Sequence, residues 1–142
     1  MRPDRPADPV AAHPPRSVPL KGLYVILDPQ AANRRSLDDL LREAAAAGVR
    51  LFQYRNKTGS AQAIYREALR LRQIAADAGA LFIVNDRCDL ALAVEADGVH
   101  LGQDDLPLAD ARSLMGPEKI VGLSTHCEAD IRAAGEADYL GF

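Results

Sequence analysis

From Leu23 onward, hydrophobic residues form short continuous runs, separated by segments in which they recur at helical spacing. The first run, Leu23 to Leu27, is closed by Asp28 and Pro29. Such runs, bounded by turn residues, are typical of strands that are buried on both faces. The segment after Ser36 instead repeats its apolar residues every three or four positions, as an amphipathic helix does. The pattern therefore predicts alternating strands and helices.

The same reading extends to the last residue. Strands are expected over 23–27, 49–55, 81–85, 98–102 and 120–124, with a further strand starting at 139. Helices are expected from Ser36 to Gly48, from Ser60 to Gly79, over 89–94, from Pro107 to Gly116 and over 128–135. The two serines are N-cap residues, Pro107 suits a first turn, and glycine is the common residue after a helix.

Strands that alternate with helices and are too apolar to face water imply a parallel sheet covered by helices. The two architectures of this kind are a doubly wound sheet and a (β/α)8 TIM barrel. No reversal of strand order is signalled, and no G-x-G-x-x-G turn follows the first strand, so we favour the barrel. A complete barrel needs roughly 200 residues or more. We therefore expect 20–142 to form an incomplete TIM-barrel domain, truncated after about six strands, in a fragment of a longer protein or one completed from elsewhere.

Composition excludes several classes of protein. Residues 1–19 contain six prolines and no apolar periodicity, so we expect a disordered leader there. The net charge of −3 gives no electrostatic footprint for nucleic acid or an anionic membrane. No apolar run could span a bilayer and no secretory signal is apparent, so cytoplasmic residence is expected. Cys88 and Cys127 are expected to be free thiols, buried or partly buried.

Strand 49–55 and the residues after it carry two cations. Side chains alternate along a strand, so Gln53, Arg55 and Lys57 share a direction if the strand geometry continues. Inside a barrel, two fixed cations near its mouth would suit a polyanion such as pyrophosphate. The alternative is a charged loop that follows a strand.

Carboxylates follow the next two strands. Asp86 and Asp105 would lie at the same mouth, where Mg²⁺ is held by one or two carboxylates together with phosphate oxygens of a substrate. Alternatively, Asp86 with Asp89, and Asp104 with Asp105, could cap the helices that follow them. Ser124 adds a hydroxyl at the end of the strand over 120–124.

Two histidines have less certain places. His100 lies within a strand, where a packed and hydrogen-bonded core residue is favoured over a role in proton transfer. His126 follows a strand, and its position suits either the start of a helix or a ligand contact.

Four motifs together resemble the thiamine phosphate synthase family: Gln53-x-Arg55-x-Lys57, Val84-Asn85-Asp86-Arg87, Ala96-Asp97-Gly98-Val99-His100-Leu101-Gly102-Gln103-x-Asp105 and Gly122-x-Ser124. The resemblance covers Leu23 to Phe142 and implies a (β/α)8 barrel. It also implies a Mg²⁺-dependent transferase of thiamine biosynthesis. Such an enzyme joins 4-amino-5-hydroxymethyl-2-methylpyrimidine diphosphate to 4-methyl-5-(2-phosphoethyl)thiazole and releases pyrophosphate.

The resemblance assigns roles to individual residues. Gln53 and Asn85 would hold the aminopyrimidine, and Arg55, Lys57 and Ser124 would grip the diphosphate as the catalytic set. Asp86 and Asp105 would hold Mg²⁺. In this family the pyrimidine–oxygen bond ionises first, and the thiazole nitrogen attacks the resulting cation.

Two departures from the family pattern stand out. Tyr54 replaces a smaller aliphatic residue, and the sequence contains no G-P-x-F-x-T-x-T-K loop, whose residues contact the thiazole phosphate. Little or no turnover is therefore expected from these 142 residues alone. The alternatives are a thiazole tautomerase-like isomerase and a chain that binds a ligand or partner without turnover. The expected partners are small-molecule substrates, and a homo-oligomer is left open.

Overall fold

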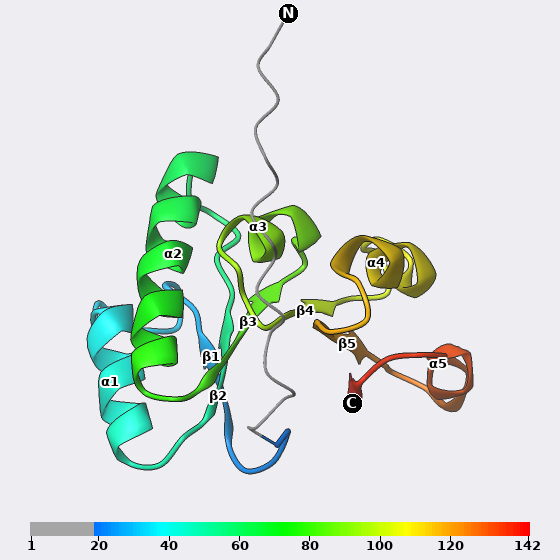
Figure 1. The fold of residues 1–142 in the computed structure, drawn as a ribbon, viewed down its shortest axis with the longest axis horizontal. Coiled ribbons are helices and arrows are strands. Elements are labelled where there is room, and N and C mark those ends of the chain that lie inside the picture. Colours follow the sequence, from blue (N-terminus) through cyan, green and yellow to red (C-terminus); the bar gives the residue numbers. More distant parts are fainter. Residues whose placement is uncertain (1–18) are drawn as a thin grey trace, which may run out of the picture.

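Residues 19–142 are described by the computed structural model, and the expected proline-rich leader lies outside them, Pro19 apart. Strands and helices alternate along the chain (Figure 1). The strands are β1 (Tyr24–Leu27), β2 (Leu51–Tyr54), β3 (Leu81–Asn85), β4 (Gly98–Leu101), β5 (Ile120–Ser124) and β6 (Tyr139–Gly141). The helices are α1 (Leu37–Ala46), α2 (Ala61–Asp77), α3 (Cys88–Ala93), α4 (Leu108–Met115) and α5 (Glu128–Ala133).

The six strands form one sheet in the order of the chain, and every neighbouring pair is parallel. A doubly wound sheet would reverse its strand order at a switch point, so this topology excludes it. The sheet has the form of a half-barrel, with the helices along its outer side (Figure 1). The expected α/β architecture and parallel strands are thus confirmed, whereas closure into a barrel stays a prediction.

The main core lies between the sheet and the helices. Phe52 of β2 and Phe82 of β3 point outward from the sheet, toward the helices. Neither has any exposed surface, and the same is true of Leu41 of α1 and Leu71 of α2. Burying a side chain of this size stabilises a fold by about 1.5–3 kcal/mol. This contact is what attaches the first two helices to the sheet.

The inner face of the sheet has a smaller apolar cluster near the amino ends of its strands. Its buried members are Leu51, Leu81, Ile83 and Ile120. Because side chains alternate across a strand, this cluster and the main core lie on opposite faces. The carboxyl half of the inner face is left for polar residues.

Tyr24 of β1 and Tyr139 of β6 show how strongly the sheet curves. Their hydroxyl oxygens are 2.7 Å apart, and their rings meet edge to face at 5.8 Å. The two strands are the opposite edges of the sheet, so their side chains can touch only across its inner face. On the same edge strands, Ile26 remains 54% exposed and Leu140 42% exposed.

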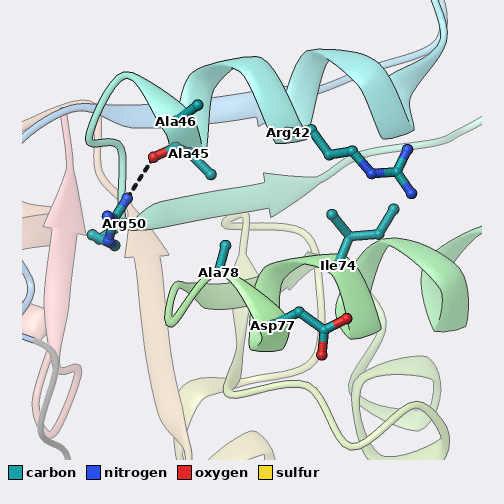
Figure 2. A pocket seen from close by; sticks show the side chains of 7 residues that line it. All are labelled: Arg42, Ala45, Ala46, Arg50, Ile74, Asp77 and Ala78. Atoms are coloured by element: carbon teal, nitrogen blue, oxygen red, sulfur yellow. Dashed lines mark hydrogen bonds between the residues drawn. The ribbon is translucent and has the colours of Figure 1, made fainter.

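Helices α1 and α2 end beside a shallow groove of about 430 Å³ (Figure 2). Arg42, Ile74 and Asp77 are among its lining residues, and Arg50 donates from Nη1 to the carbonyl oxygen of Ala45 at 2.7 Å. Arg50 directly precedes β2, so the groove lies at the amino ends of the strands. It is therefore remote from the carboxyl ends of the strands, where the sequence predicts the charged site residues.

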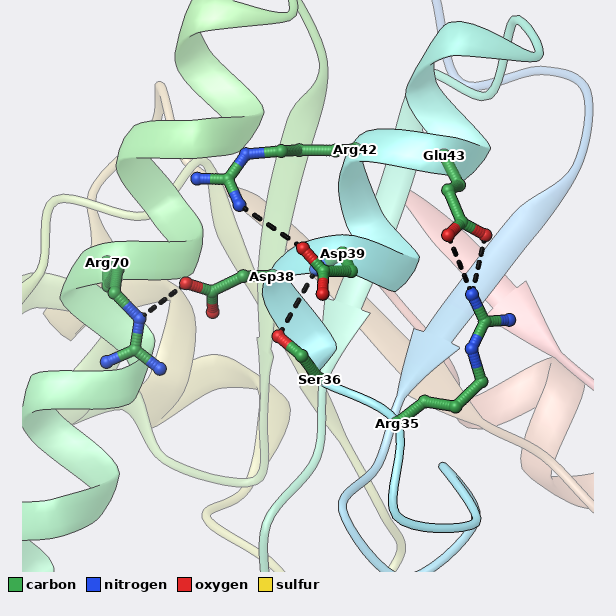
Figure 3. A network of polar contacts seen from close by, with 7 residues as sticks. All are labelled: Arg35, Ser36, Asp38, Asp39, Arg42, Glu43 and Arg70. Carbon is green, nitrogen blue, oxygen red and sulfur yellow. Dashed lines mark hydrogen bonds and ion pairs between the residues drawn. The ribbon is translucent and has the colours of Figure 1, made fainter.

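The start of α1 is tied down by polar contacts (Figure 3). Ser36 accepts a hydrogen bond from the backbone N–H of Asp39 at 3.4 Å, and Arg70 of α2 pairs with Asp38 at 2.7 Å. Ser60 caps α2 in the same way, accepting from the N–H of Ala63 at 3.2 Å. Both predicted N-caps are confirmed.

Two aspartates hold the amino ends of strands by the same contact. Asp97 accepts a hydrogen bond from the backbone N–H of Phe82 in β3, and Asp138 accepts one from Val121 in β5, both at 2.8 Å. Each carboxylate precedes the strand beside the one whose N–H it satisfies. A buried N–H without a partner would destabilise the sheet, so these contacts help to fix its register.

The cysteine predictions are correct in part. Cys88 and Cys127 are both free, and Cys88 is buried as expected. Cys127, however, is exposed, because it is the N-cap residue of α5 on the outer surface.

Within residues 19–142, none of the helices combines the length and apolarity needed to cross a membrane.

Two inward-facing glycines allow close approach across the sheet. A Cβ on Gly98 would lie far inside contact distance of the Ile120 carbonyl oxygen, and one on Gly122 would overlap the ring of Tyr139. Backbone cannot move aside as a flexible side chain can. Gly98 is thus required by the spacing of β4 and β5.

Gly98→Ala is expected to lower the free energy of unfolding by about 1–3 kcal/mol, because the added methyl group overpacks the sheet. Urea unfolding followed by circular dichroism measures the change. Gly141→Ala is the matched control, since a Cβ there would meet His100 Cε1 at an ordinary 3.5 Å. Equal stability of the two variants would contradict this account.

Candidate functional site

Charged side chains gather at the carboxyl ends of β1 to β4. Parallel strands in consecutive order bring these ends to one rim, which is where ligands bind in α/β proteins. Asp28 follows β1, Arg55 and Lys57 follow β2, and Asp86 follows β3 directly. Asp105 lies in the loop after β4. The rim thus has cations and carboxylates side by side.

Arg55 forms an ion pair with Asp28. The expected strand over 49–55 is shorter than predicted, since β2 ends at Tyr54, although the Arg55 N–H still donates to the carbonyl oxygen of Leu27 at 2.9 Å. Partial burial alone would raise the pKa of Asp28. Hydrogen bonds from the Gln30 backbone and from Arg55 outweigh that effect, so the pKa is lowered and Asp28 stays ionised beside the guanidinium.

Lys57, Asp86 and Asp105 form the centre of the rim. The Lys57 ammonium lies 3.4 Å from Asp86 Oδ2. Asp105 accepts a hydrogen bond from the backbone N–H of Gly102 at 2.7 Å and contacts the Asp86 carboxyl group. Burial, and next the neighbouring Asp86, raise the pKa of Asp105. Two carboxylates are therefore held together against their mutual repulsion.

The backbone gives Asp86 its position. Its φ of 65° lies in the left-handed region, which aspartate enters more readily than most residues. The Asp86 N–H donates to the carbonyl oxygen of His100 at 2.8 Å, which ties the turn after β3 to β4. This tight turn directs the carboxylate along the rim.

The alternative of helix capping is wrong for these aspartates. The N-cap residues of α3 and α4 are Arg87 and Pro107, and neither helix has a side-chain cap. Asp89 instead pairs with Arg87 at 2.6 Å. Asp86 and Asp105 are thus free of a capping role.

The carboxylate pair fits a hard cation. Mg²⁺ usually takes one or two protein carboxylates and completes its shell with water or substrate oxygens. Across residues 19–142, no group of three or more His, Cys, Asp or Glu side chains has the arrangement of a metal site. Asp86 and Asp105 place two carboxylates side by side and could supply two ligands of a Mg²⁺ ion.

Ser124 is linked to His100, which is buried within β4 as expected. The Oγ atom of Ser124 lies 2.8 Å from His100 Nε2, and His100 Nδ1 lies 2.8 Å from the Tyr139 hydroxyl. Burial lowers the pKa of His100. The prediction of a packed, hydrogen-bonded histidine is confirmed. The contact with Ser124 also places His100 beside a candidate site residue.

The amide residues lie on the inner face of the sheet. Gln53 is 4% exposed and donates from Nε2 to the Tyr24 hydroxyl at 2.9 Å. Asn85 is paired in register with His100. The structure thus places both amides beside the rim.

His126 is exposed and directly precedes the N-cap residue of α5. Its backbone N–H donates to Asp130 Oδ2 at 2.8 Å. Of the two predicted alternatives, His126 therefore lies at the start of a helix.

Several residues of the site were not predicted. Asp28 was interpreted only as the end of a strand, although it has the same place after β1 as Asp86 has after β3. Tyr24 and Tyr139 resembled ordinary strand residues, and their hydroxyls meet only through the curvature of the sheet. The position of Asp28 could have been noticed, but the meeting of the tyrosines has no local signal.

Asn56 anchors the loop between the two cations. Its Oδ1 accepts hydrogen bonds from the N–H groups of Thr58 and Gly59, both at 3.1 Å. Its Nδ2 donates to Glu67 Oε2 at 3.2 Å. Tyr54 is buried on the helix side of the sheet and donates to the same Glu67 oxygen at 2.5 Å. The loop that holds Arg55 and Lys57 is thereby fixed to α2.

The carboxylate pair predicts a pH effect on stability. Because the pKa of Asp105 is raised in the folded chain, folding opposes its ionisation, and stability falls as the pH rises through its titration. Asp105→Asn keeps an acceptor for the Gly102 N–H and removes the charge. In metal-free solution at pH 7 it is expected to raise the free energy of unfolding by up to about 1 kcal/mol.

Urea unfolding at a series of pH values tests this expectation. The gain should disappear at about pH 3, where the carboxylate is protonated in both states. Asp104→Asn, at the exposed neighbouring residue, serves as the control and should show no such dependence. A variant at position 105 that is less stable than the wild type at neutral pH would contradict repulsion between the carboxylates.

Comparisons with known proteins agree with this arrangement of strands. The family model described as "Thiamine monophosphate synthase" matches residues 23–142. The thiamine-phosphate synthase of Shouchella clausii is 47% identical over 84% of this chain and 58% of its own length. That of Gloeobacter violaceus is 51% identical over 84% of this chain and 34% of its own length.

A solved structure, the thiamine phosphate pyrophosphorylase from Pyrococcus furiosus, superposes with a TM-score of 0.72 at 38% identity. The match covers 83% of this chain and 57% of that one. The chain thus spans little more than half the length of that protein and of the Shouchella clausii relative. With a family match over all six strands, the chain belongs to the thiamine monophosphate synthase family.

Proposed function

We propose that this protein is a thiamine phosphate synthase. It would condense 4-amino-5-hydroxymethyl-2-methylpyrimidine diphosphate with 4-methyl-5-(2-phosphoethyl)thiazole and release pyrophosphate. The observation that carries the proposal is the contact of Lys57 with Asp86, and of Asp86 with Asp105, at the carboxyl ends of the strands. A metal-bound diphosphate would need both a cation and a pair of carboxylates, so this contact supports the proposal.

The cations would act on the leaving group. As the bond between the pyrimidine methylene carbon and the diphosphate oxygen breaks, negative charge develops on the diphosphate. Fixed positive groups stabilise that charge where it forms and so lower the barrier. Arg55 offers a planar pair of donors and Lys57 a mobile point charge, and Ser124 would add a hydroxyl donor.

The carboxylates would hold Mg²⁺ rather than the substrate itself. When bound, the ion would act as a Lewis acid that neutralises charge on the diphosphate oxygens. Asp86 is set by its turn after β3, and Asp105 is held by the Gly102 N–H. The residues of the chain therefore orient the cation site before the ligand arrives.

The pyrimidine ring would lie along the inner face of the sheet. Gln53 and Asn85 supply amide groups there, next to the rim that would take the diphosphate. An amide can both donate to and accept from the edge of an aminopyrimidine. The two amides would thus set the orientation of the ring relative to the breaking bond.

The proposal has two alternatives. A tautomerase-like isomerase has no leaving diphosphate and needs no set of Arg55, Lys57, Asp86 and Asp105, so the clustering of that set favours the synthase. A chain that only binds a ligand would retain affinity without turnover. We further propose that the sheet is part of a closed (β/α)8 barrel in a cytoplasmic enzyme, and leave a homo-oligomer open.

Pyrophosphate release with both substrates and Mg²⁺, measured on a protein that also contains the thiazole-phosphate loop, tests the synthase proposal. Lys57→Ala and Asp105→Ala are each expected to lower kcat by about 100-fold or more, because each removes a charge that acts on the departing diphosphate. Lys21→Ala and Asp104→Ala are the matched controls, since both residues are exposed and outside the cluster. Undiminished release from the two site variants would refute the residue roles.

The loop anchor gives a separate test. Asn56→Ala is expected to weaken binding of the pyrimidine diphosphate about 5- to 10-fold, because the loop loses hydrogen bonds worth about 1 kcal/mol each. Thr58→Ala leaves the backbone donors intact and is the control. Calorimetric titration of the substrate in the presence of Mg²⁺ measures both affinities, and equal values would show that Asn56 does not position the cations.

A further inference from the structure

Five side chains form a continuous series of hydrogen bonds across the inner face of the sheet. Gln53 Nε2 lies 2.9 Å from the Tyr24 hydroxyl, which lies 2.7 Å from the Tyr139 hydroxyl. The Tyr139 hydroxyl lies 2.8 Å from His100 Nδ1, and His100 Nε2 lies 2.8 Å from Ser124 Oγ. The series starts at one candidate pyrimidine contact and ends at a candidate diphosphate contact.

The direction of every bond in the series follows from its first member. The Gln53 amide nitrogen can only donate, so the Tyr24 oxygen accepts from it. Tyr24 has a single hydroxyl proton, which it donates to Tyr139. Tyr139 in turn donates to His100 Nδ1. A neutral histidine whose Nδ1 accepts must have its proton on Nε2, and this proton is donated to Ser124 Oγ.

The opposite direction does not satisfy Tyr24. If His100 donated from Nδ1 to Tyr139, then Tyr139 would donate to Tyr24. The Tyr24 oxygen would accept from both Tyr139 and Gln53, and its own proton would point at neither partner. Within the described residues, Gln53 and Tyr139 are the two partners of this hydroxyl. Both contacts of this hydroxyl are part-buried, and a donor left there without an acceptor costs up to about 1–3 kcal/mol, so the first direction is preferred.

The protonation states agree with that direction. Burial raises the pKa of Tyr24 and of Tyr139, so each phenol keeps its one proton at neutral pH. Burial lowers the pKa of His100, so its ring is neutral and one of its nitrogens can accept. Each member of the series thus has the single proton that the direction requires.

Packing holds the central pair in place. The rings of His100 and Tyr139 stack with centroids 5.4 Å apart and planes inclined by 28°. Gly122 of β5 has no side chain, and the space that a Cβ would take is filled by the ring of Tyr139. Tyr139 is therefore set in one orientation by its neighbours.

We propose that Tyr139 is a positioning residue, which fixes His100 in the Nε2–H form so that the Ser124 hydroxyl proton is left to donate to a bound anion. Ser124 Oγ accepts from His100, and its own proton points away from that ring. The identity of the anion, a diphosphate, rests on the proposed function. The direction of the hydrogen bonds rests on the geometry alone.

The tautomer of His100 tests the proposal in the free chain. In ¹⁵N-labelled wild type at neutral pH, we expect the His100 spectrum of a protonated Nε2 and an unprotonated Nδ1. Tyr139→Phe keeps the ring and removes the donor, so a mixture of tautomers is expected. Tyr24→Phe, one step earlier, leaves Tyr139 its proton and His100 Nδ1 as the acceptor, so this variant should keep the wild-type tautomer. It controls for the loss of a tyrosine hydroxyl elsewhere in the series. Tyr65→Phe removes an exposed hydroxyl outside the series and should leave the spectrum unchanged.

Affinity for inorganic pyrophosphate with Mg²⁺ gives the second readout. Tyr139→Phe and Ser124→Ala are each expected to weaken binding about fivefold, the equivalent of one hydrogen bond of about 1 kcal/mol. The double variant should lose little more than either, because both changes remove the same donor. Full additivity of the two losses would overturn the proposal.

The two readouts separate the positioning role from the function. A wild-type His100 with its proton on Nδ1, or a tautomer unchanged in Tyr139→Phe, would overturn the positioning role whatever the chain binds. If the wild type shows the expected tautomer and responds to Tyr139→Phe but binds no pyrophosphate, the hydrogen-bond direction is supported. The proposed function would then fail by itself.

Discussion

Parallel pairing of the strands in chain order is the constraint on which the candidate site depends. It places the residues after β1, β2, β3 and β4 along one rim, although they are up to about 80 positions apart in the chain. At the opposite end, Asp97 and Asp138 accept from the N–H groups of the second residues of β3 and β5 and help to hold the register. Stabilising aspartates and candidate site aspartates thus occupy opposite ends of the same sheet.

The charged side chains of the rim form two ion pairs. Arg55 is matched with Asp28, and Lys57 with Asp86, so neither cation is left uncompensated. A diphosphate with Mg²⁺ would carry both signs of charge: the anion could replace carboxylates beside the cations, while the metal takes up the carboxylates. Such an exchange lets the site bind a highly charged ligand without burying an unpaired charge, which is costly inside a protein.

Most of the architecture could be predicted from local pattern, because each strand is a short apolar run and each long helix has a serine cap. The meeting of Lys57, Asp86 and Asp105 could be predicted as well, since strand ends share a rim. Arg55 was placed on a strand that ends one residue earlier, because an alternating pattern does not show where strand geometry stops.

Other features depend on distances that no local pattern contains. The contact between Tyr24 and Tyr139 needs the curvature of the whole sheet, and the link from Tyr54 to Glu67 needs the position of α2. The prediction that Cys127 is buried or partly buried was wrong, because the residue ends a loop on the outer surface. Tertiary placement decides each of these.

Gly122 and Tyr139 share one volume on neighbouring strands, because the ring of one occupies the place where the other would have a side chain. The two positions should therefore evolve as a unit. Among related proteins, a larger residue at the position of Gly122 should be accompanied by a smaller one at that of Tyr139, and such a lineage would have to orient its histidine by other means.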